Sequence, residues 1–268
     1  MATLQQNSLV QISAEITALH NLAPGYYYLS VDAPEIARVA IPGQFAQLRV
    51  ADGIDPLLAR PISIFNASPA SGQLEFIFKI VGRGTALLGT RKVGERITVL
   101  GPLGNGFSVP ETTSAIAFVA GGVGMPPLYF LARTLSTAHS DCTMTLFYGG
   151  RTASDLLELQ CWEALAVPIT PATDDGSAGL HGLVTESLLE HLSHHSVDYI
   201  AACGPMPMLR AVQRIAVERG IAGQLALEAR MACGVGACLG CVCATVHGNR
   251  RVCVDGPVFA LDEVIFDG

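Results

Sequence analysis

The sequence predicts a β-barrel, then an α/β domain built on a parallel sheet, then a small C-terminal domain rich in cysteine and glycine. Short strand patterns without a long helix fill residues 8–100. From residue 115 onward, strand and helix patterns alternate, as they do in parallel sheets. The cysteine-rich stretch follows the last of these strands. We therefore expect three domains, at residues 1–104, 105–226 and 227–268.

Six runs of alternating polar and apolar residues, set off by Gly, Pro or Asp, predict the strands of the first domain. Their regular spacing favours a small, closed, six-stranded antiparallel barrel. The runs are residues 8–20, 26–32, 44–50, 61–65, 73–81 and 96–100.

Two short motifs in this barrel carry groups that bind anions. In Arg60-Pro61-Ile62-Ser63, the guanidinium can clamp a diphosphate and the hydroxyl can reach a phosphate or a ring edge. In Lys79-Ile80-Val81-Gly82-Arg83-Gly84-Thr85, a glycine-rich turn opens a short helix whose free N–H groups favour an anion. Each motif alone is also typical of an ordinary strand start or turn.

The second domain begins with a buried strand at 115–121 that runs into a glycine-rich turn. Gly121, Gly122 and Gly124 precede a helix opened by proline, which is a geometry that brings backbone close to a phosphate. The turn is not G-x-G-x-x-G, so the general dinucleotide fingerprint does not apply.

Further strands are predicted at 142–151, 168–175, 199–205 and 224–230, with helices at 128–135, 186–193 and 206–220. A ligand of such a sheet binds at the carboxyl ends of the strands. Gly122, Tyr148, Gly149 and the run Cys203-Gly204-Pro205 fall there.

The cysteines after residue 227 predict an iron–sulfur site. Cys233, Cys238 and Cys241 are spaced C-x4-C-x2-C, and Cys253 follows, which is the ligand order of plant-type [2Fe-2S] clusters. A structural zinc site is the alternative, although zinc sites usually pair two C-x2-C units. Cys243 lies two residues beyond a ligand and competes with Cys253 for the fourth position.

Composition excludes several other classes of function. The formal net charge of −7 and the absence of a Lys/Arg run argue against nucleic-acid binding. Apolar runs are too short for a membrane span, and MATLQQNSLV has neither a basic nor an apolar signal-peptide region. Cysteines outside the cluster pattern are single, as in a reducing compartment, so we expect a cytoplasmic protein.

The order of these motifs resembles one family over nearly the whole chain, from about residue 10 to 262. The chain is similar to the electron-transfer subunits of class B dihydroorotate dehydrogenase, within the ferredoxin–NADP reductase superfamily. The segment RMACGVGACLGC is far more specific than the nucleotide turns. The resemblance is carried by RPIS, GRGT, GPLGNGF, AGGVGMPP, YGGR, TDDGS, ACGPMPML, RMACGVGACLGC and VCVDGPVF.

This resemblance implies that the barrel binds FAD, the α/β domain binds a nicotinamide nucleotide and the C-terminal domain binds a [2Fe-2S] cluster. One Arg and no Lys in the segment after YGGR favour NAD over NADP. The expected FAD contacts are Arg60, Pro61, Ile62, Ser63, Ile77, Phe78, Lys79, Gly84 and Thr85. The expected NAD contacts are Gly121, Gly122, Gly124, Tyr148, Gly149, Cys203, Gly204 and Pro205. The expected cluster ligands are Cys233, Cys238, Cys241 and Cys253.

The resemblance also implies a catalytic partner subunit containing FMN, which oxidises dihydroorotate in de novo pyrimidine (UMP) biosynthesis. Electrons would pass from that FMN through the cluster and FAD to NAD+, in a heterotetramer of two of each chain. No acid or base is required of this chain, because hydride transfer to a flavin needs orientation. Cys203 and Glu228 are the nearest candidates for adjusting that step, and Cys203 is equally typical of a small buried hydrophobe.

Two other functions fit the same domain order. One is a diaphorase-type subunit of a cytoplasmic hydrogenase or sulfur reductase. The other is a non-catalytic electron carrier or regulatory module, against which the intact glycines at 121, 122 and 124 argue. In either complex, we expect the face around residues 234–239 to be apolar and covered by the partner.

Overall fold

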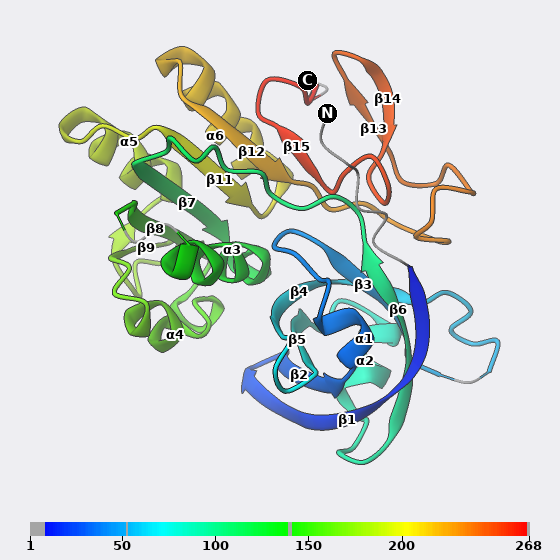
Figure 1. Ribbon diagram of the computed structural model, residues 1–268. Helices are drawn as coiled ribbons and strands as arrows, with labels where there is room; N and C mark the ends of the chain where they lie inside the picture. The colour runs from blue at the N-terminus through cyan, green and yellow to red at the C-terminus, as the bar shows by residue number, and fades with distance from the viewer. Residues whose placement is uncertain (1–8, 52, 139–140, 267–268) are drawn as a thin grey trace.

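The computed structural model describes residues 9–51, 53–138 and 141–266. Ser8, at the start of the first predicted strand, and the outermost residues of the first and third predicted domains lie outside this range. The barrel and the α/β domain lie side by side, and the C-terminal segment lies beside both (Figure 1). Among the described residues, no helix is long and apolar enough to cross a membrane.

The N-terminal domain is a closed six-stranded antiparallel barrel, as predicted, with strand order β1-β2-β5-β4-β3-β6. Burial alternates clearly along the first half of β1, and Ile16, Leu48 and Phe76 are fully buried inside the barrel. Two short helices, α1 (Pro34–Ala37) and α2 (Arg83–Gly89), complete the domain. The strands are β1 (Val10–Ala23), β2 (Tyr26–Asp32), β3 (Phe45–Arg49), β4 (Arg60–Ser68), β5 (Gln73–Lys79) and β6 (Arg96–Leu103).

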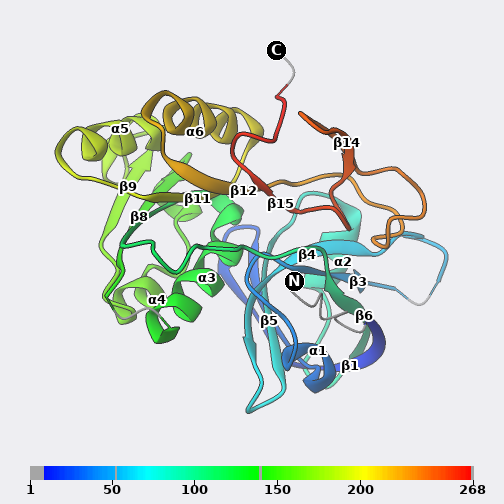
Figure 2. The same cartoon turned by 45° about the horizontal axis from the view of Figure 1, so that its top comes forward.

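The second domain has three layers, with helices on both faces of one sheet (Figure 2). Helices α3 (Met125–Ala138) and α4 (Leu159–Ala164) cover one face, and α5 (Val184–His194) and α6 (Met206–Arg219) cover the other. The sheet order is β10-β9-β8-β7-β11-β12-β15. The strands are β7 (Ala115–Gly121), β8 (Thr143–Gly150), β9 (Ile169–Thr173), β10 (Leu180–His181), β11 (Tyr199–Cys203), β12 (Ala222–Ala226) and β15 (Val258–Ala260).

The five strands expected in this sheet are present and parallel, and two further strands extend its edges. The two-residue β10 adds to β9 in parallel, while β15 pairs antiparallel with β12. Sequence reasoning missed both, because neither has a run long enough to show a period. Since β15 covers the edge of β12, the chain returns to the α/β sheet after the cysteine loop.

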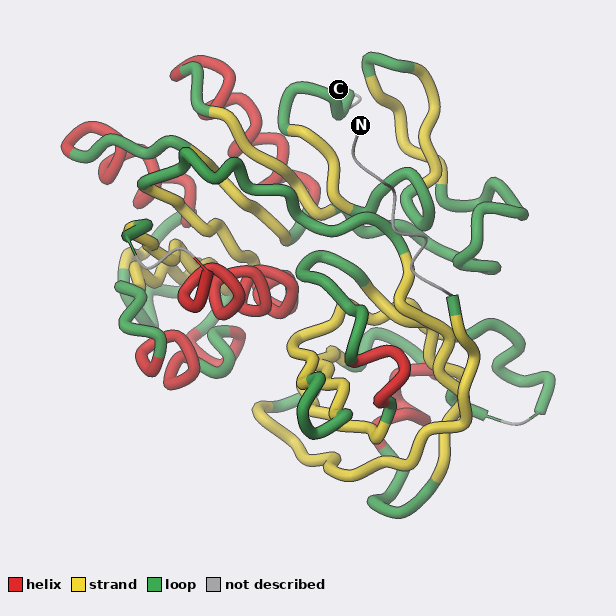
Figure 3. The backbone as a smooth tube through the Cα atoms, viewed as in Figure 1, coloured by secondary structure: helices red, strands yellow, loops and turns green. Residues whose placement is uncertain are grey.

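The rest of the C-terminal segment is mostly irregular, with one hairpin formed by β13 (Val242–Thr245) and β14 (Gly248–Arg251) (Figure 3). An isolated bridge joins Asn105 to Pro257, and the Asn105 amide donates to the carbonyls of Val254 and Asp255. The cysteine loop is therefore anchored at the junction of the other two domains.

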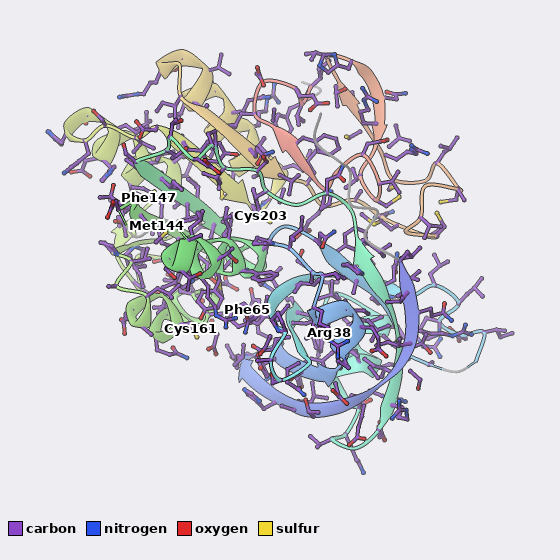
Figure 4. All side chains as sticks on the ribbon, viewed as in Figure 1. Arg38, Phe65, Met144, Phe147, Cys161 and Cys203 are labelled. Atoms are coloured by element: carbon purple, nitrogen blue, oxygen red, sulfur yellow. The ribbon has the colours of Figure 1, made fainter. Side chains whose placement is uncertain are left out.

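Aromatic side chains pack between the barrel and the α/β domain. Phe65 of β4 stacks on Tyr129 of α3, with ring centroids 4.6 Å apart, and Tyr129 meets Trp162 of α4 edge-on. Phe65 lies on the side of the barrel next to the α/β domain, near the part of that domain that carries Cys161 (Figure 4). These contacts place the carboxyl ends of the sheet next to the open side of the barrel.

Candidate functional site

A cavity of about 280 Å3 opens where the barrel meets the α/β domain, and we call it the barrel cavity. Eight of the nine expected FAD contacts line it, since residues 60–63 of β4 lie beside the end of β5. Those eight residues are Arg60, Pro61, Ile62, Ser63, Ile77, Phe78, Lys79 and Thr85. The barrel therefore gathers residues that are far apart in sequence around one opening.

Gly84, the ninth residue, lies behind this cavity against the Arg60 side chain. A Cβ at Gly84 would lie 2.0 Å from Arg60 Nε, so only glycine allows the guanidinium its position. Thr85 Oγ1 accepts a hydrogen bond from the N–H of Val81 at 3.0 Å and donates to the carbonyl of Gly82. The turn at residues 82–85 thus leaves space for the Arg60 side chain, and the hydrogen bonds of Thr85 fix the start of α2.

A second cavity of about 550 Å3 lies at the carboxyl ends of the parallel strands, and we call it the strand-end cavity. Its volume is in the range of small-molecule and cofactor sites. Five of the eight expected NAD contacts line it: Gly121, Gly122, Gly149, Gly204 and Pro205. The predicted location is the one that this fold uses for nucleotides.

Gly124 and Tyr148 support this cavity from behind. A Cβ at Gly124 would lie 2.3 Å from the carbonyl oxygen of Cys203, so the turn after β7 packs directly on the end of β11. Tyr148 is fully buried, and its hydroxyl donates to the carbonyl of Gly122 at 3.1 Å. Both residues therefore fix the shape of the turn after β7, whose Gly121 and Gly122 line the cavity.

Cys203 and Glu228 come together at the boundary of the two domains. Cys203 lies at the end of β11 that faces the barrel (Figure 4) and is almost fully buried. Burial, followed by the nearby charge of Glu228, raises the pKa of its thiol well above the usual value. Glu228 lines both the barrel cavity and the strand-end cavity. The surrounding protein keeps water from its carboxyl group, and this desolvation raises the pKa of that group.

Sequence reasoning missed a polar cluster that joins the two domains beside the strand-end cavity. Tyr26 of β2 donates a hydrogen bond to the carboxylate of Asp155, which lies just after β8. Lys79 Nζ lies 2.5 Å from the Tyr26 hydroxyl and 3.3 Å from Asp155 Oδ1. Since Tyr26 and Asp155 are 129 residues apart, no local pattern could have indicated the contact.

The hydrogen bonds and the positive charge in this polar cluster favour the ionised form of Asp155. Burial alone would raise the pKa of its carboxyl group, but the hydrogen bonds from Tyr26 and from the N–H of Arg151, together with the charge of Lys79, outweigh burial and lower that pKa. Burial, then the hydrogen bond to Asp155, raises the pKa of Tyr26, which stays protonated. The cluster is thus a charged hydrogen-bonded link between the barrel and the α/β domain.

We predict that Asp155→Asn lowers the free energy of unfolding by about 1–3 kcal/mol at pH 7. The lowered pKa in the folded state means that the stabilisation is present above the ordinary aspartate range, about 3.9, and is lost as the pH falls through the folded pKa. Urea unfolding at several pH values measures this, and the two proteins should converge in acid. Asp55→Asn, which breaks an exposed ion pair with Arg83, serves as the control with little effect. An equal loss in both variants would contradict the prediction.

The four expected cluster ligands lie together in the C-terminal loop and form two pairs. The thiols of Cys233 and Cys238 interact with each other, and those of Cys241 and Cys253 do the same. No group of three or more His, Cys, Asp or Glu side chains converges on a single metal position within residues 9–51, 53–138 and 141–266. Two thiol pairs fit a two-iron cluster, in which each iron takes two thiolates.

Backbone N–H groups point at the sulfurs, as a cluster requires. The N–H of Val235 donates to Cys233 Sγ at 3.5 Å, and the N–H of Gly236 donates to Cys253 Sγ at 3.2 Å. The Val235 N–H, aided by those of Cys238 and Ala237, lowers the pKa of Cys233 to about 6, despite burial. At Cys233 these donors favour the thiolate form that binds metal, whereas at Cys253 burial outweighs the Gly236 N–H and raises the pKa of the thiol.

Cys253 and Cys243 differ clearly in position. Cys253 is fully buried and receives the Gly236 N–H from the middle of the cysteine loop. Cys243 lies in the β13–β14 hairpin, where it pairs in register with Arg250, and it lines a different, outer cavity. Burial raises the pKa of both thiols, that of Cys253 to about 11, so position rather than pKa separates them. The placement favours Cys253 as the fourth ligand.

A closed antiparallel barrel joined to a three-layer α/β domain, with a cavity at their junction, defines the class of flavin- and nicotinamide-dependent reductases. Similarity to solved structures agrees. A chain of the NADH-dependent reduced ferredoxin-NADP oxidoreductase is 28% identical with a TM-score of 0.86, covering 95% of this chain and 90% of that chain. Ferredoxin NADP+ reductase from Neisseria gonorrhoeae, with bound FAD and NADP, shares the fold at 17% identity and a TM-score of 0.66, covering 78% and 92%.

Within this class, the chain belongs to the family of dihydroorotate dehydrogenase B electron transfer subunits. Residues 228–265 match the iron-sulfur cluster binding domain of dihydroorotate dehydrogenase B, and residues 118–214 match an oxidoreductase NAD-binding domain. The Desulforamulus reducens electron transfer subunit of dihydroorotate dehydrogenase B (NAD(+)) is 39% identical, covering 95% of this chain and 98% of that protein. The Clostridium acetobutylicum subunit is 37% identical, covering 91% and 92%.

Proposed function

We propose that this chain is the electron transfer subunit of an NAD-dependent dihydroorotate dehydrogenase. It passes electrons from the FMN of a catalytic partner subunit through a [2Fe-2S] cluster and FAD to NAD+, in de novo pyrimidine biosynthesis. The observation that carries the proposal is the junction at Glu228. This residue borders the barrel cavity and the strand-end cavity, and the chain continues from it directly into the paired cysteines.

When bound, FAD exchanges a hydride with the nicotinamide and single electrons with the cluster, which connects two-electron to one-electron chemistry. For FAD, we propose contacts from residues 60–63, 77–79 and 84–85, with Arg60, for which Gly84 leaves room, as the cation for the diphosphate. The apolar part of the cavity wall, which includes Phe45, Ile62 and Ile77, would shield a bound flavin ring from water.

For NAD, we propose that residues 121–124, Gly149 and residues 203–205 shape the strand-end cavity, with Tyr148 fixing the turn. Their role is orientation, because hydride transfer needs the two rings in contact rather than a proton donor. Glu228 lines both cavities, and Cys203 is buried next to it at the end of β11. Arg151, Asp174 and Thr185 also line the cavity and were not predicted.

The proposed cluster ligands are Cys233, Cys238, Cys241 and Cys253, all in the third of the proposed domains 1–104, 105–226 and 227–268. Val235 and Leu239 in the cysteine loop are 40% and 63% exposed, so two apolar side chains mark the face that we assign to the FMN subunit. The further proposals are a heterotetramer of two of each chain and a cytoplasmic location.

Reconstitution tests the function. The chain, loaded anaerobically with FAD and cluster, is mixed with an FMN-containing dihydroorotate dehydrogenase subunit from the same source. We expect NADH to form from dihydroorotate only when both chains are present. If the chain oxidises NADH with a dye but never couples to dihydroorotate, the proposed partner is wrong, and a diaphorase-type subunit of a hydrogenase or sulfur reductase would replace this function.

A further inference from the structure

Gln47 of β3 is a buried glutamine without hydrogen-bond partners. Its side chain is 2% exposed, yet neither Nε2 nor Oε1 has a partner. A buried polar group left in this way costs about 1–3 kcal/mol. In the described part of the chain, it is the one side-chain amide in this condition.

Gln44, three residues earlier, shows how the same fold satisfies such a side chain. It is 3% exposed, its Oε1 accepts from the N–H of Ile41 at 2.9 Å, and its Nε2 donates to the carbonyl of Gly104 at 2.8 Å. Burial in the barrel wall is therefore compatible with full hydrogen bonding. The missing partner of Gln47 points to a group that binds next to it.

The side chain of Gln47 faces the cysteine loop. Its neighbours Ala46 and Leu48 point into the barrel core, so Gln47 points out of the barrel wall. Gly234, between the first two cysteine ligands, packs on it: a Cβ at Gly234 would lie 2.9 Å from both Cγ and Nε2 of Gln47. Cys233 and Gln47 line one cavity.

Gln47 also lies beside the proposed flavin strand. It is paired in register with Pro61, the second residue of the Arg60–Ser63 motif. The residue therefore stands between the two proposed redox groups, and it belongs to the barrel rather than to the cysteine loop. The backbone donors to the Cys233 and Cys253 sulfurs, Val235 and Gly236, belong to the cysteine loop itself.

We propose that Gln47 is a positioning residue for the [2Fe-2S] site, whose Nε2 amide donates a hydrogen bond to a sulfur on the Cys233 side of the cluster. The inference rests on the proposed function. Hydrogen bonds to the sulfurs of a cluster help to set its reduction potential. Reduction adds negative charge, so a donor stabilises the reduced cluster more than the oxidised one. Gln47 therefore makes the cluster easier to reduce, and Gly234 leaves room for the amide.

Gln47→Leu tests this, because it keeps the approximate size and removes the donor. The cluster-loaded chain is titrated anaerobically, and the reduced cluster is followed by electron paramagnetic resonance. We expect the equilibrium constant for reduction to fall about three- to tenfold, where tenfold corresponds to 59 mV for a one-electron couple. Gln47→Glu should lower it further, because a carboxylate adds negative charge beside the cluster.

Gln44→Leu is the matched control: it removes a satisfied buried amide from the same region and should leave the potential unchanged. A second measurement uses wild-type protein labelled with 15N at the glutamine amide, where pulsed resonance should detect nitrogen coupled to the reduced cluster. That coupling should vanish in Gln47→Leu. If the potential and the spectrum are the same in Gln47→Leu and wild type, the inference is wrong while the proposed function stands. If the wild-type chain binds no [2Fe-2S] cluster, both are overturned.

Discussion

Cys238→Ala is expected to abolish electron transfer from the FMN subunit to NAD+, reducing NADH formation from dihydroorotate to background. Cys238 is exposed, so its removal leaves the packing of the fold unchanged. It takes one thiolate from the Cys233–Cys238 pair, and an iron atom held by one remaining cysteine cannot stay in place. The barrel cavity and the strand-end cavity are untouched, so the variant should keep FAD and still reduce a dye with NADH.

Cys243→Ala is the matched control, because it also removes a thiol near the loop but from the β13–β14 hairpin. Its iron and sulfide content and its coupled activity should equal those of the wild type. Cys253→Ala should behave like Cys238→Ala. If Cys243→Ala loses the cluster and Cys253→Ala retains it, our choice of the fourth ligand is wrong.

Gly124→Ala is expected to lower the free energy of unfolding by about 3 kcal/mol or more. The new Cβ would lie 2.3 Å from the carbonyl oxygen of Cys203 and 2.7 Å from the N–H nitrogen of Gly204. Both are backbone atoms at the end of β11, so they cannot move aside as a flexible side chain would. The start of α3 must shift away from the sheet, which also distorts the strand-end cavity.

Urea unfolding and NADH-dependent dye reduction measure these two effects. Gly122→Ala is the comparison within the same turn. A Cβ there would meet nothing closer than the Tyr26 hydroxyl at 3.9 Å, so only the cost of a φ of +51° remains, about 1–2 kcal/mol. Equal losses of stability in the two variants would show that the contact of Gly124 with β11 is unimportant.

The elements that repeat a clear period could be predicted from the sequence. All six barrel strands and the first four parallel strands of the α/β sheet lie where the sequence pattern indicated. The fifth, β12, was predicted at 224–230 but spans Ala222–Ala226, so it begins and ends earlier than its apolar run indicated. Strand β15 could not be predicted, because three residues show no period and its partner, β12, is more than thirty residues away. The reversal of β15 depends on the path of the cysteine loop, which no local pattern describes.

At the site, sequence motifs located groups whose function depends on residue type and spacing. Residues 60–63 line the barrel cavity, Gly121 and Gly122 line the strand-end cavity, and the cysteines lie together in pairs. Contacts between distant residues were missed. Asp155 follows a strand as many aspartates do, and only the folded chain brings it to Tyr26 and Lys79. Gln47 occupies an ordinary alternating position, and its missing partner is visible only in three dimensions.

Electron transfer from the cluster to NAD+ within this one chain tests the central claim most directly. The chain loaded with FAD and [2Fe-2S] is reduced anaerobically with a limiting amount of dithionite, NAD+ is added, and samples are frozen for electron paramagnetic resonance. We predict that the signal of the reduced cluster disappears as NADH forms, with one NADH for every two electrons. A reduced cluster that keeps its signal in the presence of NAD+, while FAD alone is reoxidised, would contradict the account.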